Sequence, residues 1–332
     1  MNFFITGGAG FIGSNFVRMA TGRGHNVLNF DALTYAGKRE NLSDLEGSPN
    51  YIFIKGNICD SDAVEKAFQK TFGGERFDVV INFAAESHVD RSIHAARIFS
   101  ETNVLGAATM LEAARSANVP MFIQISTDEV YGSLGSVGKF ERYSPLNPSS
   151  PYSSSKTGAD LLALSFYHTW GYDVRITRCT NNYGAYQFPE KFIPTIITRA
   201  LRGERIPVFG DGLQVRDWIY VNDHCEGIFK VIEQGKPAQI YLFGGSSEKT
   251  NLDLSRTILK ALAKKSDRPE ENFLKLITHV TDRPGHDRRY AMDWSSSKQE
   301  LGWEPTTSFE DGIEKTVAWY LDNRKWWQEL MQ

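Results

Sequence analysis

The sequence predicts an α/β protein built on a doubly wound parallel sheet, with a smaller C-terminal α/β unit laid against it. Apolar, strand-like runs alternate with helix-like segments through the first 130 residues. A glycine-rich stretch directly follows the first run, and Pro, Gly and aromatic residues become denser after Arg178. Because strands that alternate with helices are joined by right-handed crossovers, we expect a parallel sheet covered by helices on both faces.

The first part of the chain supplies six strand-like runs in order, beginning with NFFIT at residues 2–6. The nearly continuous apolar character of these runs is typical of strands buried on both faces. The later runs are NVLNF (26–30), YIFIKG (51–56), DVVINFAA (78–85), MFIQIST (121–127) and DVRITR (173–178). Between them the hydrophobic pattern predicts helices over residues 11–21, 38–45, 61–71, 95–117 and 153–170.

We expect the part of the chain after Arg178 to form most of the smaller α/β unit. Two strand-like runs in it, DWIYV (217–221) and QIYLFGG (239–245), are expected to return to the large sheet. We therefore predict one domain over residues 1–177, joined by segments near 206–245, and a second, interleaved domain over most of 178–332. Helices are expected near residues 189–201, 224–233, 252–263 and 309–321.

The composition of the 332-residue chain excludes several function classes. Its formal net charge of −3 indicates no general attraction to nucleic acid or to an anionic membrane. No apolar run approaches the roughly 20 residues that a membrane-spanning helix needs, and the N-terminus does not resemble a signal peptide. Cys59, Cys179 and Cys225 are far apart and lack metal-ligand spacing. We therefore expect free thiols, no bound metal and a cytoplasmic location.

The glycine-rich stretch TGGAGFIG (6–13) predicts a dinucleotide site and makes the sheet Rossmann-like. Gly7 permits the tight turn after the first strand, Gly10 lets the backbone approach a pyrophosphate, and Gly13 lets the helix pack closely. Asp31 ends the second strand, where a carboxylate hydrogen-bonds the ribose hydroxyls and repels a 2′-phosphate. This favours NAD over NADP. The third strand ends close to Asn57, which we expect to meet the adenine with Ile58.

A tyrosine and a lysine four residues apart predict redox chemistry on a hydroxyl group. In SPYSSSKTGAD (150–160), Tyr152 and Lys156 share one helix face. An ammonium beside a phenol is expected to lower the tyrosine pKa from about 10 and favour the phenolate. Such a tyrosine can take a hydroxyl proton while nicotinamide takes hydride. With the glycine-rich stretch, this spacing resembles the extended short-chain dehydrogenase/reductase family from residue 1 to about residue 321.

Two adjacent acids, Asp128 and Glu129, end the fifth strand in ISTDEVYG (125–132). An acid pair at this place resembles the sugar-nucleotide 4,6-dehydratases of that family. Five further stretches resemble them too, and most of all the members that act on dTDP-glucose. They are LTYAG (33–37), AAESHVDRSI (84–93), NNYGAYQFPEKFIP (181–194), GDGLQVRDWIYVND (210–223) and DRPGHDRRYAMD (282–293).

The resemblance implies an NAD-dependent lyase that converts dTDP-glucose to dTDP-4-keto-6-deoxyglucose and water, with the cofactor regenerated in each turnover. Tyr152 then takes the C4 hydroxyl proton, helped by Thr127 and Lys156. Glu129 removes and later returns the C5 proton, and a protonated Asp128 gives its proton to the departing C6 hydroxyl. Two neighbouring carboxyl groups in different protonation states suit such an elimination, because their surroundings can separate their pKa values.

The same resemblance implies two sets of binding residues. Arginine suits bidentate phosphate contacts and lysine a point charge. The cofactor set is Gly7, Gly10, Phe11, Ile12, Gly13, Asp31, Thr34, Asn57, Ile58, Ala84, Ala85, Thr102, Tyr152, Lys156 and Asn182. The substrate set is Ser87, Thr127, Asn181, Lys191, Arg216, Asn251, Arg283 and His286, of which His286 is equally compatible with a structural role.

The sequence departs from the family pattern in ways that leave alternatives open. Asn57 stands where Asp is usual, Ala185 replaces a usual Pro, and the sequence lacks the tail that often contributes to base recognition. A UDP- or other nucleotide-linked hexose is therefore an alternative substrate. A sugar-nucleotide 4-epimerase or decarboxylase, or a non-catalytic dinucleotide-sensing protein, remains a further alternative, while Asp31 disfavours an NADPH-dependent 4-reductase. The family also implies a homodimer whose helices near 95–117 and 153–170 form a four-helix bundle.

Overall fold

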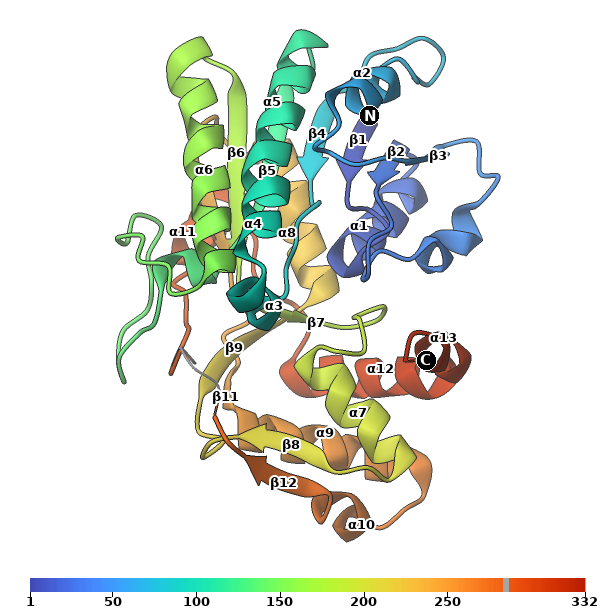
Figure 1. Ribbon diagram of the computed structural model, residues 1–332, viewed down its shortest axis with the longest axis vertical. Coiled ribbons are helices and arrows are strands. Elements are labelled where there is room, and N and C mark those ends of the chain that lie inside the picture. The colour runs from blue at the N-terminus through green and yellow to red at the C-terminus, as the bar shows by residue number, and fades with distance from the viewer. Residues whose placement is uncertain (283–286, 332) are drawn as a thin grey trace.

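A seven-stranded parallel sheet forms the centre of the larger part of the molecule (Figure 1). The computed structural model describes residues 1–282 and 287–331. The strand order is β10-β6-β5-β4-β1-β2-β3, and every neighbouring pair is parallel. The order reverses beside β1, which confirms the predicted doubly wound fold. The strands are β1 (Asn2–Thr6), β2 (Asn26–Asp31), β3 (Tyr51–Lys55), β4 (Val79–Asn82), β5 (Met121–Thr127), β6 (Asp173–Cys179) and β10 (Ile240–Phe243).

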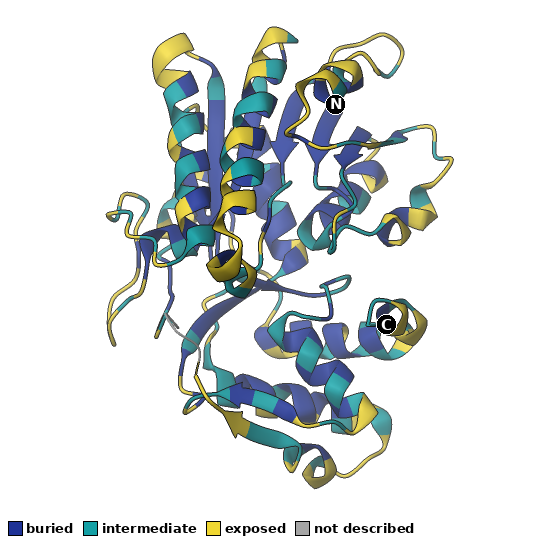
Figure 2. Ribbon diagram, viewed as in Figure 1, coloured by how far each residue is buried: buried dark blue, intermediate teal, exposed yellow. Residues whose placement is uncertain are grey.

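Helices cover both faces of this sheet, so its strands are mostly buried (Figure 2), apart from the edge strand β3, in which only Tyr51 is buried. One layer contains α1 (Phe11–Gly22), α8 (Val221–Gln234) and α11 (Ser295–Leu301). The other contains α2 (Ser61–Phe68), α4 (Ala96–Ser100), the π-helical turn η2 (Glu101–Leu105), α5 (Gly106–Ser116) and α6 (Pro151–Trp170). Short helices in the connections are the 3₁₀ helices η1 (Arg39–Leu45) and η3 (Asp128–Tyr131), and α3 (Val89–His94).

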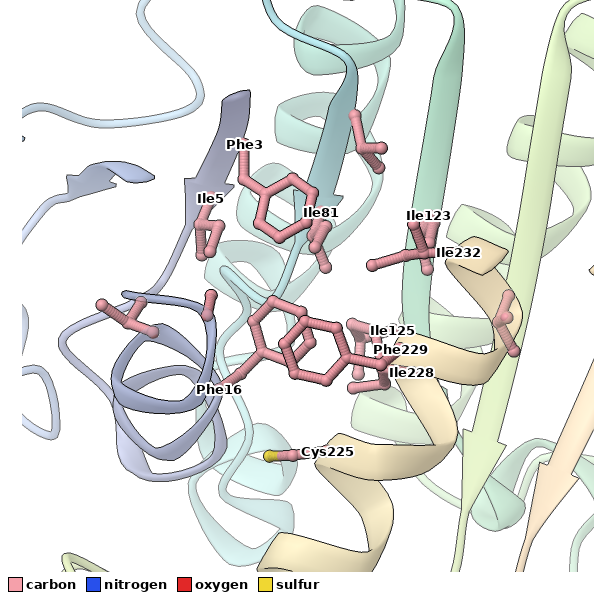
Figure 3. Packing of buried hydrophobic residues seen from close by; sticks show 14 of the residues in the cluster. Phe3, Ile5, Phe16, Ile81, Ile123, Ile125, Cys225, Ile228, Phe229 and Ile232 are labelled. Carbon is pink, nitrogen blue, oxygen red and sulfur yellow. The ribbon is translucent and has the colours of Figure 1, made fainter. Parts of the chain in front are cut away.

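The two-residue period of the strands divides the core between these layers. Phe3 and Ile5 of β1 point to the α1 and α8 side, where Phe16 and Phe229 stack with ring centroids 4.5 Å apart (Figure 3). Phe4 points to the opposite side and packs with the α2 and α5 side chains. Burial of alternating residues on both faces fixes the register of the sheet, because a slip by one residue would exchange the two faces.

The smaller part of the molecule holds two short sheets, one of three strands and one of two. In the first, β9 pairs in parallel with β7 and antiparallel with β11, and in the second β8 and β12 are parallel. A separate apolar core joins these sheets to the helices. The elements are β7 (Asn181–Tyr183), α7 (Phe192–Arg202), β8 (Ile206–Phe209), β9 (Val215–Tyr220), β11 (Glu248–Thr250), α9 (Asn251–Ser266), α10 (Glu270–Leu274), β12 (Ile277–Val280), α12 (Phe309–Asp322) and α13 (Arg324–Glu329).

One strand prediction is wrong. The run QIYLFGG supplies β10, which joins the large sheet beside β6, but DWIYV supplies most of β9, which does not. The free edge of β6 is already occupied by β10, and the Asp217 carboxylate of β9 accepts hydrogen bonds from Gly245 and Ser247 at 3.1 and 2.6 Å. They connect β9 to the segment between β10 and β11, while β9 itself pairs with β7 and β11. The division into domains 1–177 and 178–332 stays a prediction.

A fully buried ion pair connects α6 to the sheet. Arg178 of β6 donates through Nε to Asp160 of α6 at 2.9 Å, and both side chains are at most 2% exposed. Ser126 of β5 donates to the same Asp160 oxygen at 2.9 Å. Arg178 Nη1 also donates to the Tyr131 hydroxyl of η3 at 2.7 Å. The pair therefore joins α6, β5, β6 and η3 at one point.

No helix in the described part of the chain is long and apolar enough to cross a membrane.

The buried pair gives a stability prediction. Asp160→Ala leaves Arg178 charged and buried, so we expect the free energy of unfolding to fall by about 3–5 kcal/mol in urea titrations. The double variant Asp160→Leu/Arg178→Met removes both charges and is expected to recover most of the loss. A loss below about 1 kcal/mol in the single variant would show that the pair does not hold these elements together.

Candidate active site

The carboxyl ends of the large sheet open into a cavity of about 630 Å³. Residues that follow each of the strands β1 to β6 line it, which is where ligands bind in open α/β sheets. The structure brings together all of the predicted catalytic and cofactor residues on its wall. The wall includes Gly7, Gly10, Phe11, Ile12, Gly13, Asp31, Thr34, Asn57, Ile58, Ala84, Ala85, Thr102, Thr127, Asp128, Glu129, Tyr152, Lys156 and Asn182.

The glycine loop is shaped as the sequence predicts. Gly7 has a φ of +69°, and a Cβ there would lie 2.6 Å from the backbone nitrogen of Ala84. A Cβ on Gly13 would lie 2.3 Å from the carbonyl oxygen of Gly7. The loop therefore lies directly against the sheet, and the N-terminus of α1 faces the cavity. Backbone N–H groups and the helix dipole at that end suit the pyrophosphate of a dinucleotide.

Asp31 is held beside this loop by the backbone. Its Oδ2 accepts a hydrogen bond from the Ala9 N–H at 2.9 Å, and its Oδ1 accepts one from Leu33 at 2.8 Å. Burial raises the pKa of Asp31, and these two backbone donors oppose that rise. The carboxyl group lies in the cavity wall, as does Thr34, so it can accept from the hydroxyls of a ribose. The residues present thus fit a bound NAD.

Tyr152 and Lys156 lie in the first two turns of α6, which begins at a capping box formed by Ser150 and Ser153. Lys156 is 4% exposed, and its Nζ donates to the Ile125 carbonyl oxygen at 2.6 Å. Burial lowers the pKa of Lys156, while the negative charge of Asp160 raises it. The ammonium group is therefore fixed between β5 and α6, on the wall of the cavity.

The expectation that Lys156 lowers the pKa of Tyr152 is wrong for this structure. Burial raises the pKa of Tyr152 well above its usual value, and the charges of Glu129 and Asp128 raise it further. A hydrogen bond with Thr127 opposes this rise. The sequence shows the lysine four residues away but not how far water is excluded from the phenol.

Asp128 and Glu129 form the start of η3, directly after β5. Asp128 is 2% exposed, and the Thr127 hydroxyl donates to its Oδ1 at 3.3 Å. Burial and the neighbouring Glu129 raise the pKa of Asp128 well above the ordinary value, although Arg216 lowers it. Its Oδ2 is buried and has no hydrogen-bond partner among residues 1–282 and 287–331. A protonated Asp128 can therefore offer a proton to a ligand in the cavity.

The predicted substrate residues are only partly brought together. Ser87, Thr127, Asn181 and Lys191 line the cavity. Arg216 and Asn251 are not part of its wall. Arg216 is buried and donates to the carbonyl oxygens of Val215 and Asp287 at 2.8 Å each, and the Asn251 backbone N–H donates to Gln214 at 3.0 Å. Arg283 and His286 lie outside the described residues.

The sequence reasoning missed Asn103, which lies in η2. Its Oδ1 accepts from the Glu86 N–H at 2.8 Å, and its Nδ2 donates to the Glu86 carbonyl oxygen at 3.0 Å and to Ser155 Oγ at 2.8 Å. One amide thus fixes the loop after β4 to α6. The signal was a buried Asn inside a helical segment, where a polar side chain needs partners.

The nearest neighbours of Asn182 were missed as well. His224 of α8 is fully buried, and its Nδ1 lies 3.0 Å from the Asn182 Oδ1. Burial lowers the pKa of His224 to about 3, so the imidazole is neutral. The Asn182 Nδ2 donates to the Thr180 carbonyl oxygen at 3.0 Å and to Cys179 Sγ at 3.2 Å. Burial raises the pKa of the Cys179 thiol to about 12.

Within the described ranges, no group of three or more His, Cys, Asp or Glu residues could hold a metal ion.

Comparisons with known proteins agree with this fold. A family model described as GDP-mannose 4,6 dehydratase matches residues 4–316. A dTDP-glucose 4,6-dehydratase of Xanthomonas campestris is 48% identical over 99% of this chain and 95% of its own length. The Streptomyces venezuelae dTDP-glucose 4,6-dehydratase, solved with NAD bound, is 44% identical with a TM-score of 0.92, covering 99% of this chain and 100% of that one. A Thermotoga maritima UDP-glucose 4-epimerase is 30% identical with a TM-score of 0.87, covering 98% and 100%.

The glycine loop gives a prediction with a matched control on the same helix. Gly13→Ala places a methyl group against the Gly7 carbonyl, so we expect NAD affinity to fall at least about tenfold in a calorimetric titration. A Cβ on Gly22 meets nothing within 4 Å. Gly22→Ala should therefore leave NAD affinity unchanged and alter the free energy of unfolding by less than about 1 kcal/mol. Equal NAD affinity in the two variants would contradict the packing described for the loop.

Proposed function

Because the chain belongs to the GDP-mannose 4,6 dehydratase family, we propose that it is an NAD-dependent dTDP-glucose 4,6-dehydratase, a lyase that forms dTDP-4-keto-6-deoxyglucose and water. The observation that carries this proposal is the acid pair beside the tyrosine. Asp128 and Glu129 share one cavity wall with Tyr152 and Lys156. Oxidation at C4 needs only the tyrosine and the cofactor, whereas elimination of water also needs an acid and a base.

The residues of the chain divide this chemistry between them. NAD, when bound, accepts hydride from C4 and supplies it again at C6. The phenolate form of Tyr152 takes the proton of the C4 hydroxyl. The Lys156 ammonium and the positive charge of bound NAD would favour this form against the burial that raises the tyrosine pKa. The C4 ketone makes the C5 proton acidic, and Glu129 removes this proton. Asp128 protonates the C6 hydroxyl as it leaves as water, and Glu129 finally returns a proton to C5. Thr127 is placed to hydrogen-bond the C4 oxygen.

The environments of the two acids support these different roles. Asp128 is the more deeply buried acid, and its raised pKa favours the protonated form that an acid catalyst needs. The Glu129 backbone N–H donates to Thr127 Oγ1 at 3.3 Å, which fixes the start of η3. Neither a 4-epimerase nor a decarboxylase needs acid-assisted loss of a C6 hydroxyl. A 4-epimerase activity is therefore the second candidate function, although the UDP-glucose 4-epimerase of Thermotoga maritima has a similar fold.

NAD and dTDP-glucose are the cofactor and substrate that the relatives support. Three of the solved dehydratases have NAD bound, and the Asp31 carboxyl lies where a 2′-phosphate would be repelled. Eight curated relatives at 44–48% identity are named dTDP-glucose 4,6-dehydratases, one of them as probable. In this proposal residues 1–177, joined by segments near 206–245, bind NAD, and residues 178–332 mainly bind the nucleotide sugar. Ser87, Asn181 and Lys191 contact the substrate from the cavity wall, and Arg216 and Asn251 contact it outside this wall.

We also propose a homodimer through α4–α5 and α6, which lie side by side on one face of the molecule (Figure 1). Five large apolar side chains of these segments are 36–61% exposed, namely Ile98, Leu105, Leu161, Tyr167 and Trp170. Covering them with the same helices of a second copy would form a four-helix bundle. Sedimentation of the purified protein as a monomer at micromolar concentration would contradict this.

The three free cysteines fit a cytosolic location, which cell fractionation tests.

The first test supplies the purified protein with dTDP-glucose and, separately, UDP-glucose, without added reductant. We expect dTDP-glucose to lose one water by mass, with no net NADH, and UDP-glucose to react about 10- to 200-fold more slowly, because the bases differ by one methyl group. A sugar isomer of unchanged mass would replace this proposal with an epimerase.

The roles proposed for the acids and the tyrosine predict that substitutions of these residues block different steps of the reaction. Tyr152→Phe should abolish C4 oxidation. Asp128→Asn should still permit it but slow water loss by about 10²- to 10⁴-fold. Because only the protonated form donates, water loss in the unaltered protein should also fall as pH rises through the raised pKa of Asp128, and this dependence should disappear in Asp128→Asn. Quenched-flow mass spectrometry separates the two steps, and normal product formation by Asp128→Asn would refute the acid role.

A further inference from the structure

One wall of the cavity is built from three segments that are distant in sequence. Tyr35 follows β2, Glu86 and Ser87 follow β4, and Phe188 and Lys191 precede α7, yet all five line the same cavity. The first two segments leave the large sheet, whereas the third leads into the smaller part of the molecule (Figure 1). This wall therefore bridges the two parts of the chain.

The centre of the wall is the Tyr35 ring. The Phe188 ring meets it edge-on, with centroids 5.7 Å apart and planes at 83°. The Arg91 guanidinium lies 4.0 Å from the Tyr35 ring centroid, and its Nη1 lies 3.6 Å from Glu86 Oε2. Arg91 and Glu190 do not line the cavity and support it from behind. Burial and the neighbouring Glu190 raise the pKa of Tyr35, which stays a neutral phenol.

Two further contacts join the second and third segments beside Tyr35. His88 Nε2 lies 3.6 Å from Glu190 Oε2, and Lys191 Nζ donates to the Ser87 carbonyl oxygen at 3.1 Å. Both contacts link residues after β4 to residues before α7. The Arg91–Glu86 pair, at 3.6 Å, is longer than the ideal 2.7–2.9 Å, and the Arg91 side chain is 44% exposed. Burial lowers the pKa of His88, which favours its neutral form, so its contact with Glu190 is weaker than an ion pair. Contacts of this kind are weak enough for water to replace them, so the wall can open.

We propose that these contacts, the Tyr35 clasp, keep the dinucleotide in its cavity between the two halves of the reaction. The clasp comprises Tyr35, Glu86, Arg91, Phe188 and Glu190, with His88, Ser87 and Lys191 at its side. This inference rests on the proposed function. That reaction oxidises C4 and reduces C6 with one cofactor molecule, so a cofactor that left after the first step would strand a ketone without a reductant. The clasp is a positioning device and touches none of the reacting atoms.

The test compares two arginines with the same local geometry. Arg23 lies 4.0 Å from the Phe229 ring and pairs with Glu226, and its side chain is 37% exposed, but it follows α1 and is remote from the cavity wall. The holoenzymes of Arg91→Ala and Arg23→Ala are passed through gel filtration, and the NAD that remains per chain is measured. We expect Arg91→Ala to release NAD about 5- to 20-fold faster than Arg23→Ala or the unaltered protein.

A second variant and a second measurement guard against a simple folding defect. Glu190→Ala removes the partner of His88 without altering a cavity-lining residue, and it should also release NAD faster while keeping the thermal midpoint of the unaltered protein. During turnover of dTDP-glucose, filtrates of both clasp variants should contain NADH and a 4-keto sugar that still has its C6 hydroxyl, and added NAD should restore the rate.

Full NAD retention in both clasp variants, without NADH in the filtrate, would overturn the clasp. Failure of the unaltered protein to act on dTDP-glucose would instead refute the proposed function, and NAD retention on gel filtration would still decide for or against the clasp.

Discussion

The buried ion pair between Asp160 and Arg178 is the interaction on which the arrangement of the candidate site depends. It anchors α6, which carries the tyrosine and lysine, to β6. Through the Tyr131 hydroxyl it also reaches η3, which begins with the two acids. A buried ion pair is stabilising only when further hydrogen bonds support it. Here the bonds from Ser126 and to Tyr131 support the pair, and they also place two functional segments relative to each other.

Exclusion of water has opposite effects on the groups around this anchor. It raises the pKa values of Asp128 and Tyr152 and lowers that of Lys156, because burial penalises every charged form. Asp128 is thereby kept as an acid, which is the form its role requires. Lys156 lies near the carboxylate of Asp160, whose charge opposes the loss of its proton. The Asp160 carboxylate therefore has two effects: it pairs with Arg178, and it helps to keep the buried Lys156 side chain protonated.

The sequence was sufficient for the features that depend on local pattern. Alternating strands and helices, the glycine loop, Asp31, and the acids at the end of β5 all lie where short stretches of sequence predict them, and their residues line one cavity. Features set by long-range contacts were not accessible in this way. Asn103 and the Tyr35 clasp join segments 17 or more residues apart. The pKa of Tyr152 depends on burial by several elements, and β9 was misplaced because another strand had taken its edge.

The position of β10 also determines the order in which the molecule can be completed. Strand β6 ends at Cys179, but its edge partner begins only at Ile240, after a stretch that contains β7, α7, β8, β9 and α8. During synthesis from the N-terminus, β6 is therefore an open, apolar edge until more than sixty further residues have emerged, and such edges promote pairing with other chains. The parallel pairing of β10 requires closure of this long loop, which slows folding. Ribosome-bound chains that end between these two strands are the ones most in need of a chaperone.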